Sequence, residues 1–210
     1  HDVADYPATT EGMGIGIGYG ACNGLFIDNI SSQTSCQFMI YGSAANAILY
    51  NYARECTRGT TPVVMPGLQY HGGQGLMNLM EGNIWPGICD DGYHGSASHD
   101  TAVRNWFHGT SSMTDQFWIC VNLNRFTRCY NIVGNVLGRK GYTWLYEVEQ
   151  VGFSYDKHYI YSLGFPNMGN GWSNGKMVQS GKGKYWADWD KLLASPRGKG
   201  PVTRRRLLSS

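Results

Sequence analysis

An asparagine followed by a bulky apolar residue recurs five times in this chain, at spacings of 22, 32, 22 and 30 residues. The residue three positions before each asparagine is also apolar. A period just above twenty residues, with insertions in alternate repeats, is typical of a solenoid in which each repeat forms one coil. The repeated pairs are Asn29 and Ile30, Asn51 and Tyr52, Asn83 and Ile84, Asn105 and Trp106, and Asn135 and Val136.

The composition favours strands over helices in these coils. Charged residues make up 15% of the 210 residues, below the roughly 25% of an ordinary domain, and there are 29 glycines. Stretches rich in Val, Ile, Tyr, Phe and Trp show the period-2 alternation of strands. We therefore expect each asparagine to adopt the left-handed conformation at a bend and to stack on the asparagine of the next coil. The residue after it, including Trp106, is expected to face the core.

The segments NLMEGNI, YHGSASHDTAVRN and YNIVGNVLG resemble the repeats of the pectate-lyase-like superfamily of right-handed parallel β-helices. The resemblance covers residues 13–165 and implies an all-β, right-handed parallel β-helix of about five or more coils with a C-terminal cap. Residues 1–12 are then an N-terminal segment or cap, 166–196 a C-terminal loop and capping segment, and 197–210 a basic flexible tail.

The same resemblance implies a secreted or extracellular protein, including one on a cell or virion surface, that cleaves or binds a polysaccharide along a groove. If it is an enzyme, the expected activity is that of a polysaccharide lyase or a glycoside hydrolase. The fold also occurs in non-catalytic adhesins, tail fibres and surface structural proteins, so that alternative stays open. A homo-oligomer is a further arrangement that the resemblance implies.

The charge distribution argues against nucleic acid as the partner of the main body. Five of the 17 basic residues lie in 197–210, where there is no acidic residue, and residues 1–196 hold 12 basic against 15 acidic residues. A nucleic-acid-binding surface is normally strongly basic. No apolar run approaches the roughly 18–20 residues of a transmembrane helix.

The segment DDGYHGSASHDTAVRN (90–105) concentrates chemically active residues in one coil. Alignment with GSAANAILYN (42–51) pairs Gly95, Ser96 and Ala97 with scaffold residues, and leaves the charged residues as additions. Glycosidases need two carboxyl groups, although an Asp-rich turn and solvated surface arginines would look the same. The catalytic candidates are Asp90, Asp91, His94, His99, Asp100 and Arg104.

Binding and metal candidates lie around this segment. In lyases of this fold, acids hold calcium while an arginine acts as base, which makes Asp90, Asp91 and Asp115 candidate calcium ligands. Trp118 and Trp172 lie off the repeated position and could stack on sugar rings, with Arg125 as a further substrate contact. The six cysteines are consistent either with disulfides or with buried thiols.

Overall fold

The computed structural model describes residues 12–58, 63–92, 94–111, 119–124, 126–143, 145–147, 159–165, 172–173 and 176–177. The chain divides into two units, His1–Gly169 and Asn170–Ser210. The first unit is a parallel β-helix built of three parallel sheets, and the described residues contain no helix. This confirms the expected fold class.

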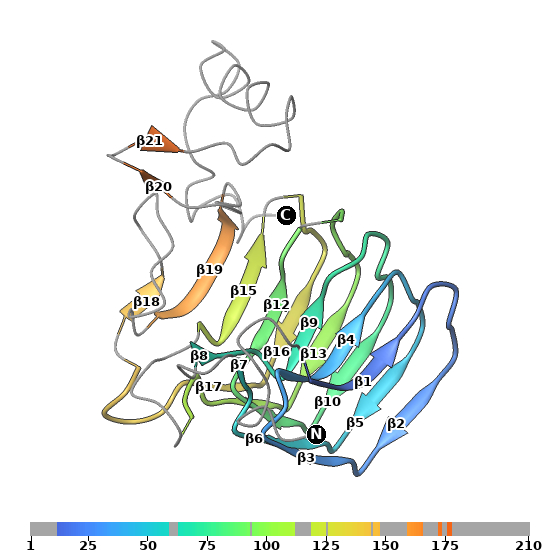
Figure 1. Cartoon of the computed structure of the whole chain (residues 1–210), viewed down its shortest axis with the longest axis horizontal. Helices are drawn as coiled ribbons and strands as arrows, with labels where there is room; N and C mark the ends of the chain where they lie inside the picture. Colours follow the sequence, from blue (N-terminus) through green and yellow to red (C-terminus); the bar gives the residue numbers. More distant parts are fainter. Residues whose placement is uncertain are drawn as a thin grey trace. The chain divides into compact units, whose positions relative to one another are not determined.

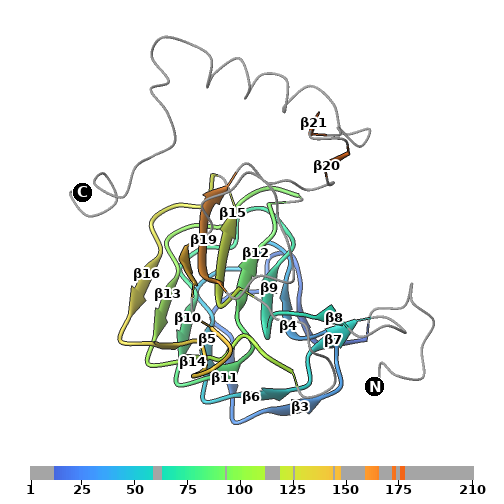
Figure 2. The ribbon, with the colours of Figure 1, turned by 90° about the vertical axis from the view of Figure 1, so that its left-hand side faces the viewer.

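Each coil contributes one short strand to each sheet, and the strands of successive coils lie side by side (Figures 1 and 2). Sheet 1 contains β1 (Met13–Ile17), β4 (Cys36–Ile40), β9 (Leu68–Tyr70), β12 (Ile88–Asp90), β15 (Val121–Asn124), β19 (Tyr159–Phe165) and β18 (Leu145–Glu147) in that order. Sheet 2 contains β2 (Leu25–Ile27), β5 (Ala47–Leu49), β10 (Leu79–Glu81), β13 (Thr101–Val103) and β16 (Asn131–Val133). Sheet 3 contains β3 (Ile30–Ser32), β6 (Tyr52–Arg54), β11 (Ile84–Trp85), β14 (Trp106–Phe107) and β17 (Val136–Leu137).

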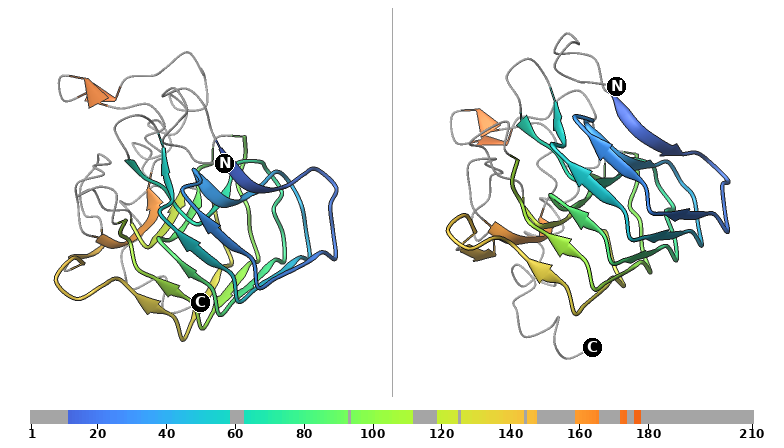
Figure 3. Two further views of the ribbon diagram at one scale, coloured as in Figure 1. Left: turned by 60° about the horizontal axis from the view of Figure 1, so that its bottom comes forward. Right: turned by 90° about the horizontal axis from the view of Figure 1, so that it is seen from below.

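The register between coils follows the spacing of the asparagines. In sheet 2, Ala47 pairs with Leu25 on one side and with Leu79 on the other. Leu79 pairs with Thr101, which pairs with Asn131. These steps are the same 22, 32, 22 and 30 residues, so the insertions fall outside sheet 2. Figure 3 shows the strands of successive coils stacked next to one another.

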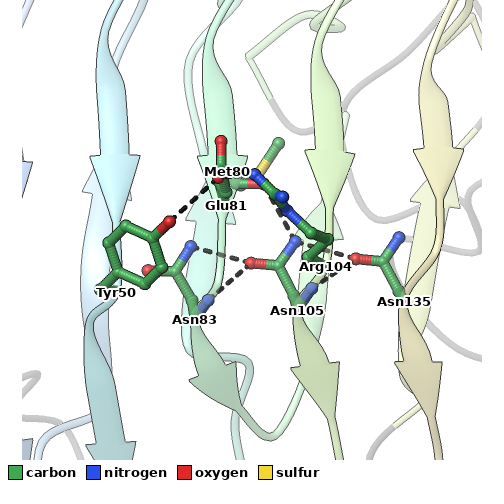
Figure 4. Close-up of polar contacts among 7 residues, drawn as sticks. All are labelled: Tyr50, Met80, Glu81, Asn83, Arg104, Asn105 and Asn135. Atoms are coloured by element: carbon green, nitrogen blue, oxygen red, sulfur yellow. Dashed lines mark hydrogen bonds and ion pairs between the residues drawn. The ribbon is translucent and has the colours of Figure 1, made fainter.

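The asparagines form a continuous ladder at bend 2, the bend between sheets 2 and 3 (Figure 4). Each side-chain amide donates to the Oδ1 atom of the asparagine in the next coil, at 2.8 Å for the first pair and 2.9 Å for the others. The backbone N–H of each donates to the same oxygen. The bonds between asparagines all run in one direction along the chain, from coil 1 to coil 5, whereas the other amide hydrogen of each later asparagine donates to a backbone carbonyl of the preceding coil.

The left-handed residue at bend 2 is the one before the asparagine, which corrects the expectation that asparagine itself adopts this conformation. Positive φ angles of 52° to 67° occur at Asp28, Tyr50, Gly82, Arg104 and Gly134. The asparagines therefore contribute hydrogen bonds through their side chains, whereas the preceding residue turns the backbone. Bend 1, between sheets 1 and 2, repeats this arrangement with positive φ at Asn23, Ala45, Met77, His99 and Cys129.

The interior is filled by side chains from all three sheets, and sheet 1 contributes two per strand in places, such as Phe38 and Ile40 of β4. The residues three positions before the ladder asparagines face inward as expected, and Ile48, Met80 and Ala102 are fully buried. Trp85 stacks on Phe107 in the next coil with ring centroids 6.1 Å apart. Its indole Nε1 donates to the buried amide of Gln37 at 2.7 Å, so this polar core residue is paired.

The apolar residues after the asparagines face outward, and the expectation that they face the core was wrong. Ile30 and Val136 are 80% and 62% exposed, and Trp106 is 39% exposed. The alternation of side chains along a strand explains this: the asparagine points inward at the bend, so its neighbour points out.

The insertion in the second coil forms an antiparallel pair, β7 (Thr57–Arg58) with β8 (Val63–Val64), and Val64 packs against Cys89 of sheet 1. All six cysteines are free thiols. The second unit contains the antiparallel pair β20 (Trp172–Ser173) and β21 (Lys176–Met177). Most of the expected terminal segments 1–12, 166–196 and 197–210, including the C-terminal cap, lies outside the described residues.

Candidate functional site

Sheet 1 carries polar residues at the positions that alternate with its inward-facing residues. In β9, β12, β15 and β19 these positions are Gln69, Cys89, Asn122 and Ser162, which pair with one another in register across four strands. Inward neighbours such as Leu68, Tyr70, Ile88 and Val121 belong to the core. The outer side of sheet 1 therefore carries a polar row that crosses several coils, but this row is covered, since Cys89, Asn122 and Ser162 are at most 4% exposed.

An aspartate–histidine pair lies at one end of this row, one residue beyond β9 and β12. Asp91 Oδ2 accepts a hydrogen bond from Gln69 Nε2 at 2.8 Å and a very short one from His71 Nδ1. Because a carboxylate can only accept, Nδ1 donates the hydrogen of this bond, which leaves Nε2 as the ring nitrogen available to a ligand. The side chains of His71 and Asp91 are 30% and 19% exposed, so this pair reaches the surface.

Aromatic rings surround His71. The His94 ring lies edge-on to it with centroids 4.9 Å apart, and the Tyr41 ring lies edge-on at 5.9 Å. Tyr41 in turn lies 6.0 Å from Tyr19. The residues come from four successive coils, and each is followed directly by glycine in the sequence. Space is needed there: a Cβ atom on Gly72 would lie 2.8 Å from the Cα atom of Tyr41.

Three buried oxygen atoms on the outer side of sheet 1 have no hydrogen-bond partner among the described residues, namely Gln69 Oε1, Asn122 Oδ1 and Ser162 Oγ. The orientation of the Gln69 amide is fixed because its Nε2 atom must face the Asp91 carboxylate. An unpaired buried acceptor costs about 1–3 kcal/mol.

Asp90 points into the interior and not toward Asp91. Its Oδ2 atom accepts from the backbone N–H of Ala97 at 2.8 Å and the hydroxyl of Thr127 at 2.5 Å, and Oδ1 accepts from the N–H of Gly92. Burial raises the pKa of Asp90 to about 6, although these hydrogen bonds oppose the shift. The carboxyl group is fully buried and holds bend 1 together.

Asp100 has structural counterparts in the other coils, so its treatment as an addition to the repeat was wrong. It lies five residues before Asn105, as Asn46 and Asn78 lie five before their asparagines. Asn46 donates to Asn78, and Asn78 donates to Asp100 Oδ1 through both its backbone N–H at 2.7 Å and its side chain at 3.0 Å. Asp100 ends a second ladder at bend 1, where burial raises its pKa to about 6.

The alignment behind the earlier assignment was shifted by one residue. Ala44 pairs with Leu76 and Leu76 with Ser98, so Ser98, and not Ala97, is the counterpart of Ala44. His99 and Arg104 then occupy the left-handed positions of bends 1 and 2, which other residues fill in the other coils. His99 is exposed and lies 2.9 Å from the Ser98 hydroxyl through Nδ1.

The structure thus distributes the expected catalytic residues over four places, one of which is the exposed position of His99 at bend 1. Asp91 and His94 meet on the outer face of sheet 1, with His71 between them. Asp90 and Asp100 lie in the interior, and Arg104 lies at bend 2, where it forms an ion pair with Glu81. Asp115, Trp118 and Arg125 lie outside the described residues, and only the backbone of Trp172 is described, in β20 of the second unit.

Calcium ligation by Asp90 and Asp91 does not fit this geometry. The Asp90 oxygens accept three protein hydrogen bonds in the interior, whereas Asp91 faces the other side of the sheet. Across the described ranges, no three His, Cys, Asp or Glu residues are grouped so as to hold a metal ion.

The sequence analysis assigned no role to Gln69, His71 or Asn122. A signal was present: LQYHG, ICDDG and VNLNR each place two polar residues around one inward residue at the end of a strand. The coils they belong to are separated by unequal insertions, so their alignment required the register of sheet 1.

The chain matches no protein family, and no curated protein or solved structure is detectably similar to it. None of the described residues forms a helix that is long and apolar enough to span a membrane.

Proposed function

We propose that this chain is an extracellular, secreted protein that acts on a polysaccharide through the outer face of sheet 1. The observation that carries this proposal is the Asp91–His71 pair, which lies within a row of ring side chains, Tyr19, Tyr41, His71 and His94, that runs across four successive coils. A row in this direction matches an elongated polymer better than a compact ligand.

The chemistry of the pair suits proton transfer. Asp91 fixes the orientation and tautomer of His71, and it stabilises the imidazolium that forms when Nε2 takes up a proton. His71 is thus the proposed general base, Asp91 its positioning residue, and His94 a neighbouring ring. In a lyase, the base removes a proton beside a uronate carboxylate; in a hydrolase, it activates water. Each reaction leaves a different product.

The alternative is a non-catalytic β-helix, such as an adhesin, a tail-fibre component or a surface structural protein. The position of the carboxyl groups favours it over a two-carboxylate glycosidase: Asp90 and Asp100 are interior, and Asp91 alone of the three lies on the outer face. A binding protein would use the same face without proton transfer.

Product release from neutral and uronate-containing polysaccharides, with and without calcium, tests this proposal. Reducing ends indicate hydrolysis, and absorbance of unsaturated uronates indicates elimination. We expect His71→Gln and Asp91→Asn to lower kcat/KM at least about a hundredfold, as losses of a general base and its partner do. His99→Ala is the matched control, because this exposed histidine belongs to the same corner without contacting Asp91 in the structure.

Unchanged activity in His71→Gln would refute the assigned role of the base. Retention on a polysaccharide without any product would favour the binding alternative. If the folded protein is not retained on any polysaccharide and releases no product, the proposed function as a whole is wrong.

A further inference from the structure

A second row of exposed side chains runs along the outside of bend 2, on the side of sheet 3. The residues after the ladder asparagines pair in register: Ile30 with Tyr52, Tyr52 with Ile84, Ile84 with Trp106, and Trp106 with Val136. The two aromatic residues, Tyr52 and Trp106, are 40% and 39% exposed. They lie two coils apart, which at about 4.8 Å per coil is about 9.6 Å along the axis.

A polar network flanks this row at the left-handed positions of bend 2 (Figure 4). The Tyr50 ring lies against Gly82 of the next coil, where a Cβ atom would come within 2.5 Å of the ring. Its hydroxyl donates to Glu81 Oε1 at 3.1 Å, and Arg104 Nη2 donates to the same oxygen. Three coils thus hold an aromatic ring, a carboxylate and a guanidinium beside the row of Tyr52 and Trp106.

This combination has the chemistry of a sugar-binding surface. Aromatic rings pack against the apolar C–H face of a pyranose, while Arg and Glu can bond its hydroxyl groups. An extended polysaccharide advances by about one sugar per coil spacing, so successive sugars would lie over Tyr52, Ile84 and Trp106.

We propose that this bend 2 ridge, formed by Tyr50, Tyr52, Ile84 and Trp106 with Glu81 and Arg104, is a second binding site that holds an extended polysaccharide along the axis of the β-helix. The class of ligand rests on the proposed function, but the site is separate from the outer face of sheet 1. A protein partner is the competing occupant, because Tyr, Trp and Arg are also enriched in interface cores, but it would bury the Glu81–Arg104 pair at a desolvation cost that sugar hydroxyl groups avoid. Arg104 has 68% of its side chain exposed.

Affinity electrophoresis of the full chain in gels containing xylan, mannan, β-glucan, galactan, dextran or polygalacturonate tests the ridge. We expect the double substitution of Tyr52→Ala and Trp106→Ala to weaken retention by the polymer that the wild type binds by about tenfold, as the loss of two stacking contacts predicts. Tyr52→Phe with Trp106→Phe, which keeps both rings, should retain binding. Tyr142→Ala is the control, because Tyr142 is 41% exposed and lies outside the ridge.

The outcomes separate the ridge from the proposed function. Retention of the double variant as strong as that of the wild type would overturn the ridge. If the double substitution instead changes the sedimentation coefficient and leaves retention unchanged, the ridge is a protein interface, which also overturns the proposal. Cleavage or binding of short oligosaccharides without retention by any polymer would overturn the ridge alone. A chain that neither binds nor cleaves any glycan would overturn both proposals. Support requires weaker polymer retention with an unchanged rate on short oligosaccharides.

Discussion

Asp100 shows how one residue can keep its place in a repeat while changing its chemistry. It accepts the two hydrogen bonds from Asn78 that an asparagine would accept there, but its Oδ2 atom has no partner. The hydroxyls of Tyr70 and Tyr130 lie near this carboxyl group without forming a hydrogen bond of good geometry. A protonated carboxyl group suits this interior better than a charged one.

The stability of the fold should therefore depend on pH through Asp100. Its pKa is raised from 3.8 to about 6 by burial, so the folded state binds more protons than the unfolded state between these values. The free energy of unfolding is then highest below about pH 4 for this group, and falls by about 3 kcal/mol as the pH rises through 6. Asp100→Asn should remove this loss and stabilise the protein at pH 7, measured by urea denaturation from pH 4 to 8.

Asp90→Asn is the informative contrast. Asp90 accepts hydrogen bonds at both oxygens, so an amide would place its NH₂ group against a donor. We expect this substitution to destabilise the protein at pH 7, opposite in sign to Asp100→Asn. Equal effects of both substitutions would show that desolvation alone governs these two carboxyl groups.

At the scale of elements, the ladder at bend 2 connects every coil to the next. The Asn83 side chain accepts from the backbone N–H and amide of Asn51, and it donates to the carbonyl of Ile48 and to Asn105. Since these groups are buried, Asn83→Ala should lower the free energy of unfolding by about 3–4 kcal/mol. The measurement is equilibrium denaturation, with the β-sheet circular dichroism signal as readout.

Asn29→Ala provides the matched control for this prediction. Asn29 donates to Asn51 and to Ile27, but it accepts no bond from the described residues at its Oδ1 atom and it is less buried. We expect a loss of about 1 kcal/mol. Equal losses at Asn29 and Asn83 would contradict the ladder as the source of the effect.

The sequence allowed the coils and their spacing to be predicted, because asparagine recurs wherever the chain must satisfy buried backbone groups at a bend. It did not reveal whether the Trp106 side chain points to the core or to the surface, because a bulky apolar residue occurs on both sides of a sheet. Asp91 and His94 were candidates from the sequence, since both stand out chemically. His71 and Gln69 required the pairing of strands across insertions of unequal length.

At the scale of the whole β-helix, coils in the middle have neighbours on both sides. β10 pairs with β5 and β13, whereas β2 pairs with β5 alone among the described strands. In a solenoid, stability depends on such nearest-neighbour contacts. Hydrogen exchange measured by mass spectrometry should therefore show β10 amides exchanging at least about tenfold slower than β2 amides. Uniform exchange rates would instead mean that the coils open as one cooperative unit.

The single direction of the bend 2 ladder has a consequence for how such a protein can lengthen. Each of the three middle coils offers an acceptor oxygen to the coil before it and donor hydrogens to the coil after it. A tandem duplication of one coil would place an identical acceptor and identical donors at the new junction, so both neighbours would find the partners they had before. Evolution can therefore change the length of this chain by whole coils, and with it the extent of its surface, without inventing a new bend.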